Sequence, residues 1–349
     1  MMRGLRHLTL LTCALSLVAT PVLAGHPAGQ QGAASKTASP PDGTAATREK
    51  ALLGLQRDLV SVLALRVDSQ PLLGAALYAR PLVNQPKFAT FHALIERAAH
   101  AEDAGAAVSW VRLADCDAKA DACPNTDALD QLVTQAPDNA AVWLLKLGED
   151  AHNMKPDAAR ADLAKAAGAK QYDDYTGISL KALADTVSML PPPADTIDPT
   201  HAAGAMGVKQ VLVFGLASTQ PQPGLQVTAK LCENAGDDAS IKTDCLNLSK
   251  ILEWGSSPLG RSLGLHLREV LADDPAQQQD AKHARLNLIW QVQSFAQLSA
   301  RAQGDAALSQ HLLLLATSGG TEMSLLLAAL RDNNIPTDAP ADWKPQRSE

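Results

Sequence analysis

The chain has 349 residues, a formal net charge of −7 and only 3% aromatic residues. Alanine and leucine together make up about a third of it, which is typical of a helix-rich globular protein. Without a cluster of lysine and arginine, the acidic balance argues against nucleic acid as a partner. The composition also excludes collagen-like, coiled-coil and multi-span membrane proteins. The sequence therefore predicts an acidic helical protein.

The first 24 residues have the three parts of a secretory signal peptide. Two arginines form the basic region, and residues 8–19 form an apolar stretch too short to remain as a membrane span. Val22 and Ala24 supply the small residues at −3 and −1, which places cleavage after Ala24. We expect a periplasmic or secreted protein of a Gram-negative bacterium, without a transmembrane anchor after cleavage. An uncleaved anchor and a lipoprotein modified at Cys13 are the alternatives.

Composition divides the rest of the chain into four segments. Residues 25–46 are expected to be a disordered linker, because they contain too little apolar surface to offset their ordering entropy. Residues 47–190 and 200–331 have apolar residues at helical spacing and are expected to form an N-terminal and a C-terminal helical lobe, separated by three consecutive prolines. Residues 332–349 are a polar, Pro-rich tail, which we expect to be unstructured apart from Trp343.

Helix start and stop signals divide both lobes into short helices. Apolar positions from residue 47 to residue 62 predict an amphipathic helix of about five turns. Asn139 is expected to cap a helix at 140–152, and Pro156 opens the next helix. The run 211–214 alone is compatible with a buried strand, but its neighbours favour a buried helix. Further helices are expected near residues 71–81, 88–104, 106–116, 129–133, 180–190, 231, 246–254, 259–271, 281–299, 306–317 and 323–330.

Short connections between these helices predict an all-α fold of antiparallel helical hairpins stacked as an α-solenoid in two lobes. One pair of helices has a repeat-like pattern at Trp143, Leu147, Gly148, Ala151, Ala159, Leu163 and Ala166. This pattern resembles a tetratricopeptide (TPR) helix pair over about 30 residues. The resemblance implies a TPR-like arrangement and a protein-binding role, and it identifies no binding residues. No period of about 34 residues recurs elsewhere in the chain.

Four cysteines remain after removal of the signal peptide: Cys116, Cys123, Cys232 and Cys245. In an exported chain without a Cys-x-x-Cys motif, four cysteines indicate two disulfides and no redox chemistry. Spacing alone leaves three connectivities open. Hairpins stacked in a line contact mainly their sequence neighbours, which favours Cys116–Cys123 and Cys232–Cys245.

His92, Glu96 and His100 are the candidates for a metal site. Their spacing of four residues places them along one helix face, where imidazole and carboxylate groups are suitable zinc or iron ligands. The first and third side chains are roughly 12 Å apart along the helix axis, so one ion needs ligands from another helix to bind both. We therefore expect a solvated polar stripe and no metal or other cofactor.

Ser262 lies in a G-x-S-x-G sequence, which presents the nucleophile of many hydrolases on a strand-to-helix turn. The preceding residues predict no strand, so small residues that allow close helix packing are the alternative interpretation. Tyr172 and Tyr175 flank two aspartates at the expected start of a helix. These tyrosines are possible binding residues, because exposed tyrosine rings make effective contacts.

The leading hypothesis is a non-catalytic exported protein that binds another protein, as an adaptor or as an immunity-type inhibitor that neutralises a toxin. The first alternative is an exported hydrolase that uses Ser262 or the site of His92, Glu96 and His100. The second is a binder of small molecules or peptidoglycan fragments in a groove between helices. Whether the chain is an enzyme stays open at this point, although no motif favours catalysis.

Overall fold

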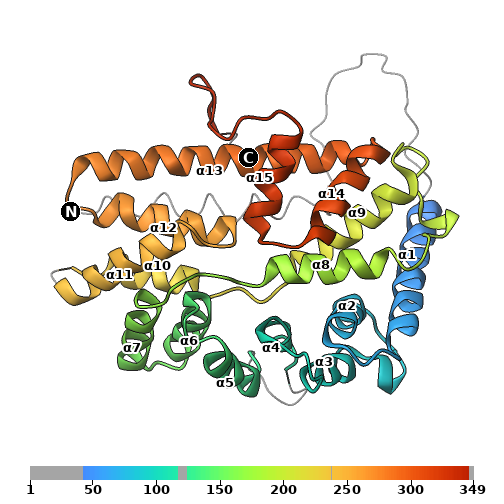
Figure 1. The fold of residues 1–349 in the computed structure, drawn as a ribbon, viewed down its shortest axis with the longest axis horizontal. Coiled ribbons are helices and arrows are strands. Elements are labelled where there is room, and N and C mark those ends of the chain that lie inside the picture. The colour runs from blue at the N-terminus through green and yellow to red at the C-terminus, as the bar shows by residue number, and fades with distance from the viewer. Residues whose placement is uncertain (1–41, 117–123, 237, 346–349) are drawn as a thin grey trace, which may run out of the picture.

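The computed structural model describes residues 42–116, 124–236 and 238–345 (Figure 1). Within these ranges the chain forms fifteen α-helices, two short 3-10 helices and no β-strand, which confirms the predicted all-α class. The predicted signal peptide and most of the predicted linker lie outside the described residues. No helix in the described ranges combines the length and the apolar character that crossing a bilayer requires.

The helices follow one another with short connections. In chain order they are α1 (Asp42–Leu63), α2 (Ser69–Ala79), η2 (Lys87–Ala89), α3 (Phe91–Ala99), α4 (Ala106–Arg112), α5 (Thr126–Gln135), α6 (Ala140–His152), α7 (Pro156–Ala167), α8 (Thr176–Val187), η3 (Ala194–Thr196), α9 (Gly204–Ala217), α10 (Leu225–Glu233), α11 (Ala239–Leu252), α12 (Pro258–Leu271), α13 (Pro275–Ala302), α14 (Ala306–Ser318) and α15 (Glu322–Asp332).

Local sequence signals set most of these boundaries. The Asn139 side chain accepts a hydrogen bond from Ala141 N at the start of α6, and α7 begins at Pro156, both as predicted. The run 211–214 is part of α9, which confirms the helix over the strand. The helix expected at 88–104 is instead divided into η2 and α3, because the Thr90 side chain caps α3.

The helices are arranged in two rows, and the chain completes most of the first row before it forms the second (Figure 1). Helices α2 to α7 form the lower row in this view, α9 to α15 return above them, and α8 lies between the rows. As a result α8 packs on α2, α10 on α6, and α11 on α7. In a linear solenoid each hairpin contacts mainly its sequence neighbours. These long-range contacts therefore depart from the stack expected from the short connections, although α6 and α7 do pack together as a hairpin.

Two main hydrophobic cores lie side by side, and each draws on both halves of the chain. One combines Leu73 of α2 with Val213 of α9, and the other combines Leu144 of α6 with Leu248 of α11. These two cores therefore do not confirm the predicted division into lobes at residues 191–200. Prolines do end the helical pattern there, but the apolar faces on either side of them are buried against each other.

The segment between α7 and α8 crosses between the two rows, and its residues Tyr172, Asp174 and Tyr175 are buried. Asn139 donates through Nδ2 to Asp173 O (2.7 Å) and accepts at Oδ1 from Asp173 N (2.9 Å). Ser256, just before α12, donates its backbone N–H to Tyr172 O (3.0 Å) and accepts at Oγ from Asp174 N (3.1 Å). We name residues 171–175 the connector. Its backbone groups are paired with both rows, which permits an irregular segment inside the protein.

The start of α15 packs directly on the connector and on α8. Met323 N donates to Ser256 O (2.9 Å), and Gly320 O lies against Gly177. Glu322 is half-buried here, beside Asp174. Burial, together with the negative charge of Asp174, raises the pKa of Glu322 from 4.5 to about 8. Glu322 is therefore largely protonated in the folded protein at neutral pH.

The disulfide Cys232–Cys245 joins α10 to α11, as predicted, and both cysteines are buried in the second core. This bond excludes the two connectivities that would tie the halves of the chain together. Cys116 is also disulfide-bonded. Cys123 lies outside the described residues, so that the Cys116–Cys123 pair stays a prediction.

The C-terminal tail is held on α13 as far as Trp343. Trp343 packs edge-on against Trp290, with ring centroids 5.3 Å apart, and Trp290 Nε1 donates to Pro336 O (2.8 Å). Asn287 also contacts the tail, through Asp338 and the backbone of Ala339. The tail forms no helix, but the expectation of an unstructured segment is wrong for these residues, because aromatic packing and hydrogen bonds fix it.

Replacing Gly177 by Ala should destabilise the protein by about 2 kcal/mol or more, because a Cβ there would lie 1.9 Å from Gly320 O. The matched control is Gly54→Ala in α1, where a Cβ meets nothing within 4 Å. That change should leave stability unchanged or raise it by up to about 1 kcal/mol. Urea unfolding of both variants is the measurement, and equal stabilities would contradict the close packing of α8 on the start of α15.

Replacing Glu322 by Gln should reduce the loss of stability at alkaline pH. The folded protein keeps the Glu322 proton up to about pH 8, whereas the unfolded chain loses it near pH 4.5. The free energy of unfolding therefore falls as pH rises through this window. Between about pH 5.5 and about pH 8.5, the wild-type Tm should fall by at least about 2 °C more than the variant Tm.

The exposed Glu102, changed to Gln, is the control for that comparison, and it should behave as the wild type. Histidines also titrate between these pH values, so the difference between the two glutamate variants isolates Glu322. Identical pH dependence in the Glu322 variant and the wild type would show that Glu322 is ionised in the folded state at neutral pH.

Candidate functional site

The three metal-site candidates lie on or next to α3, and each has a hydrogen-bond or ion-pair partner. His92 Nδ1 is 2.8 Å from Asp115 Oδ2, Glu96 pairs with Arg112, and His100 Nδ1 donates to Glu96 O (2.7 Å) at the helix end. Within the described ranges, no group of three or more His, Cys, Asp or Glu side chains is arranged to hold a metal. The structure therefore does not bring these residues together around one point.

Ser262 lies inside α12 and is 8% exposed. The helix begins at Pro258 after the N-cap Ser257, so that the serine is not on the strand-to-helix turn that a nucleophile elbow needs. Gly260 lies against the ring of Tyr172, and Gly264 lies against the backbone of α11. The small residues of this sequence thus contact neighbouring elements closely, as the packing interpretation predicts.

Tyr172 and Tyr175 are buried, with 3% and 8% of their surfaces exposed. The Tyr175 hydroxyl accepts from Asn139 Nδ2 (3.2 Å), and its ring meets Trp110 edge-on at 5.5 Å. The Tyr172 hydroxyl lies near Ser257 without a hydrogen bond of standard geometry to any described residue. Burial raises the pKa of both phenols. The expectation of exposed tyrosine rings is wrong, because the connector carries both rings into the core.

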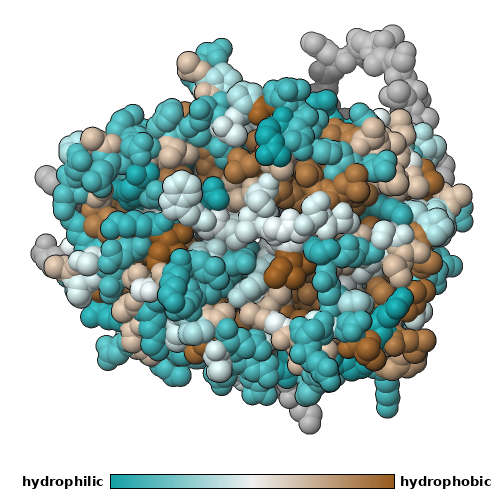
Figure 2. Space-filling model, viewed as in Figure 1, coloured by the Kyte–Doolittle hydropathy of each residue, from teal (hydrophilic) through white to brown (hydrophobic). Residues whose placement is uncertain are grey.

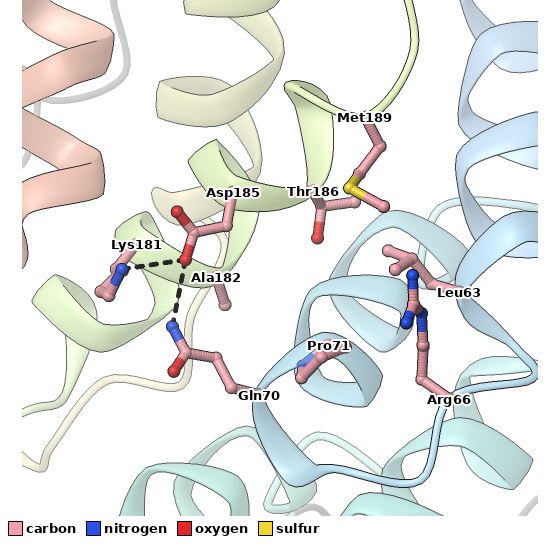
Figure 3. Close-up of a pocket in the computed structure, with 9 residues that line it drawn as sticks. All are labelled: Leu63, Arg66, Gln70, Pro71, Lys181, Ala182, Asp185, Thr186 and Met189. Atoms are coloured by element: carbon pink, nitrogen blue, oxygen red, sulfur yellow. Dashed lines mark hydrogen bonds and ion pairs between the residues drawn. The ribbon is translucent and has the colours of Figure 1, made fainter.

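A cleft of about 370 Å³ opens where α1, α2 and α8 meet (Figure 3). This volume falls in the range of sites that hold a small ligand or a short peptide segment. Figure 3 shows Leu63 and Arg66 on the α1 side, with α2 and α8 opposite. The lining residues are Leu63, Arg66, Gln70, Pro71, Lys181, Ala182, Asp185, Thr186 and Met189.

The α2 and α8 side of the cleft carries a closed polar network. Asp185 Oδ2 accepts from Lys181 Nζ (2.9 Å) and from Gln70 Nε2 (3.2 Å), and Lys181 also donates to Thr317 O of α14 (2.9 Å). The network links three helices and uses the charge of Lys181 to balance that of Asp185. Its members therefore hold this side of the cleft in place and leave no excess charge there.

The floor of the cleft depends on the close packing of α2 on α8. A Cβ at Gly74 would lie 2.1 Å from Thr186 Oγ1 and 2.8 Å from Ala182 O. Ser69 at the start of α2 donates its backbone N–H to Asp103 Oδ1 (2.8 Å), which fixes the first turn and lowers the pKa of Asp103. Gly74 and this cap together place the first turn of α2 beside α8.

On the α1 side of the cleft, Arg97 of α3 fixes the backbone at the end of α1. Arg97 donates to Ala64 O (2.5 Å) and to Arg66 O (2.6 Å), so it caps the end of α1 and holds the turn that follows. The Arg66 side chain itself is exposed and makes no ion pair or hydrogen bond with any residue that the structure describes. The cleft therefore has one cation whose charge is unbalanced within the described part of the chain.

Exposed apolar side chains surround this turn. Leu65 is 82% exposed, Val67 76%, Met189 44% and Val62 42%. The face in Figure 2 has hydrophobic patches that are more extensive over the half of the molecule containing α1, α2 and α8 than over the other half. Apolar surface of this kind, next to polar groups, is typical of a site that another molecule covers.

Sequence reasoning did not find the cleft. Two local signals were present: apolar residues beside Arg66 in a turn, and Lys181 and Asp185 at the i, i+4 spacing of a helical ion pair. Neither signal predicts that α1 and α2 lie against a helix more than 100 residues later in the chain.

Comparisons of the chain with protein-family models, with curated proteins and with solved structures find no match.

Proposed function

We propose that this chain is an exported, non-catalytic helical protein that binds a segment of a protein partner in the cleft between α1, α2 and α8. The observation that carries the proposal is the cleft itself, in which an apolar lining adjoins an unpaired cation. A rigid helical framework with a small number of placed polar groups is the usual construction of a recognition site.

The surroundings of the cleft favour a macromolecular partner over a small ligand. Leu65 and Val67 are exposed in the turn beside the lining residues, where a small molecule of cleft size would leave them in water. A partner that covers both the cleft and this turn would bury apolar surface in the centre and keep Arg66 at its edge. A peptidoglycan fragment fits the volume of the cleft, and it is the second candidate.

The non-catalytic part of the proposal is supported by the positions of the candidate catalytic groups. Ser262 is packed within a helix, and His92 lies against Asp115. Glu96 contacts Arg112 and His100. The lining residues of the cleft are an ion pair, Arg66, Gln70, Thr186 and apolar groups, without a serine, cysteine or histidine. An adaptor and an immunity-type inhibitor both fit a surface of this kind, because each acts by occupying a partner.

Replacing Met189 by Glu tests the proposal. Met189 lines the cleft and is 44% exposed, so the change adds a charge to the site without disturbing the core. Burial of this unpaired carboxylate under a partner should weaken binding about 30-fold or more. The measurement is affinity capture from a periplasmic extract with the wild type and the variant, followed by mass spectrometry of the captured proteins.

The matched control is Met154→Glu, at the turn after α6, where the methionine is 87% exposed and far along the lower row from α2. We expect the wild type and the Met154 variant to capture the same protein, and the Met189 variant to lose it while its circular dichroism is unchanged. Capture of one protein set by all three forms would contradict a site in this cleft.

A further inference from the structure

The two sides of the cleft differ in net charge. On the α8 side, the charges of Lys181 and Asp185 cancel across a distance of 2.9 Å. On the α1 side, Arg66 is exposed and has no partner among the described residues, so the lining has an excess of one positive charge. The complete chain has a net charge of −7, so an anionic group is repelled by much of the surface and attracted to this cleft.

The space next to Arg66 is apolar. In Figure 3 its guanidinium group lies beside Leu63, with Met189 above the cleft and Pro71 below it. A guanidinium group binds a carboxylate through two parallel hydrogen bonds, and the apolar groups around it accept a hydrocarbon side chain. A matching ligand therefore presents a carboxylate and an apolar side chain within a few ångströms of each other.

The last residue of a polypeptide carries both groups on a single Cα atom. We propose that the cleft binds the C-terminal residue of its protein partner, with the terminal carboxylate on Arg66 and an apolar side chain against Leu63, Pro71 and Met189. This inference rests on the proposed function and names the part of the partner that is bound. The residues before the C-terminus lie over the exposed Leu65 and Val67, beside the cleft.

The probe is the peptide N-acetyl-Gly-Ala-Ala-Leu with a free C-terminal carboxylate, titrated into the purified full chain by isothermal calorimetry. Amidation of the same peptide removes the charge and keeps the side chain, and it should weaken binding at least about tenfold. Arg66→Gln should weaken binding of the free acid by a similar factor and should abolish the difference between the acid and the amide.

Arg57→Gln is the control, because Arg57 is an exposed arginine of α1 that does not line the cleft. It should bind the free acid as the wild type does. A third peptide, N-acetyl-Gly-Asp-Ala-Leu-amide, offers an internal carboxylate only, and it should bind as weakly as the first amide. Arg66→Lys should recover part of the affinity lost in Arg66→Gln, since lysine keeps the charge without the bidentate geometry.

Equal binding of the acid and the amide, or no binding of the acid at millimolar concentration, would overturn this inference. So would tight binding of the peptide with the internal aspartate. The capture experiment with Met189→Glu separates the two proposals. If that variant loses the partner while the free-acid peptide does not bind, the cleft is the binding site but the bound segment is not a C-terminus.

Discussion

The hydrogen bonds of the connector hold the two rows of helices together. A chain that enters the interior without regular structure must pair its backbone N–H and C=O groups, because each unpaired group costs about 1–3 kcal/mol. Here Asn139 pairs the connector with the lower row and Ser256 pairs it with the upper row. The direction of α8, which starts directly after the connector, follows from this pairing.

The position of α8 in turn creates the cleft. Gly74 and Thr186 bring α2 and α8 into close contact, and Arg97 holds the end of α1 beside them. Lys181 joins the same helix to α14. The cleft is therefore lined by helices that are fixed from several directions, so a partner of the kind we propose would meet groups already in place and would lose less entropy on binding. Arg66 and the apolar residues of its turn, Leu65 and Val67, are exposed beside these helices.

Residue types that are common in catalysis have structural roles in this protein. His92 contacts Asp115 at the surface, Ser262 lies within a packed helix, and Tyr172 fills the space between the connector and α12. Glu322 is half-buried beside Asp174, and the resulting rise in its pKa to about 8 links the stability of this junction to pH. At the cleft, by contrast, the Arg66 guanidinium group has no partner among the described residues and lies beside apolar side chains.

Local structure was determined by the sequence alone. Helix class, most helix boundaries, the cap at Asn139 and the Cys232–Cys245 disulfide depend on residues close together in the chain, through propensity, capping and short loops. The arrangement of the helices into lobes or a stack was not predictable in this way. An amphipathic pattern indicates that one face of a helix is buried, but it does not indicate which other helix covers that face. Tertiary structure alone decided that α8 lies on α2, that Tyr172 and Tyr175 are buried, and that Arg66 faces a cleft. Each of these depends on contacts between segments about 100 residues apart, which leave no periodic pattern in a single sequence.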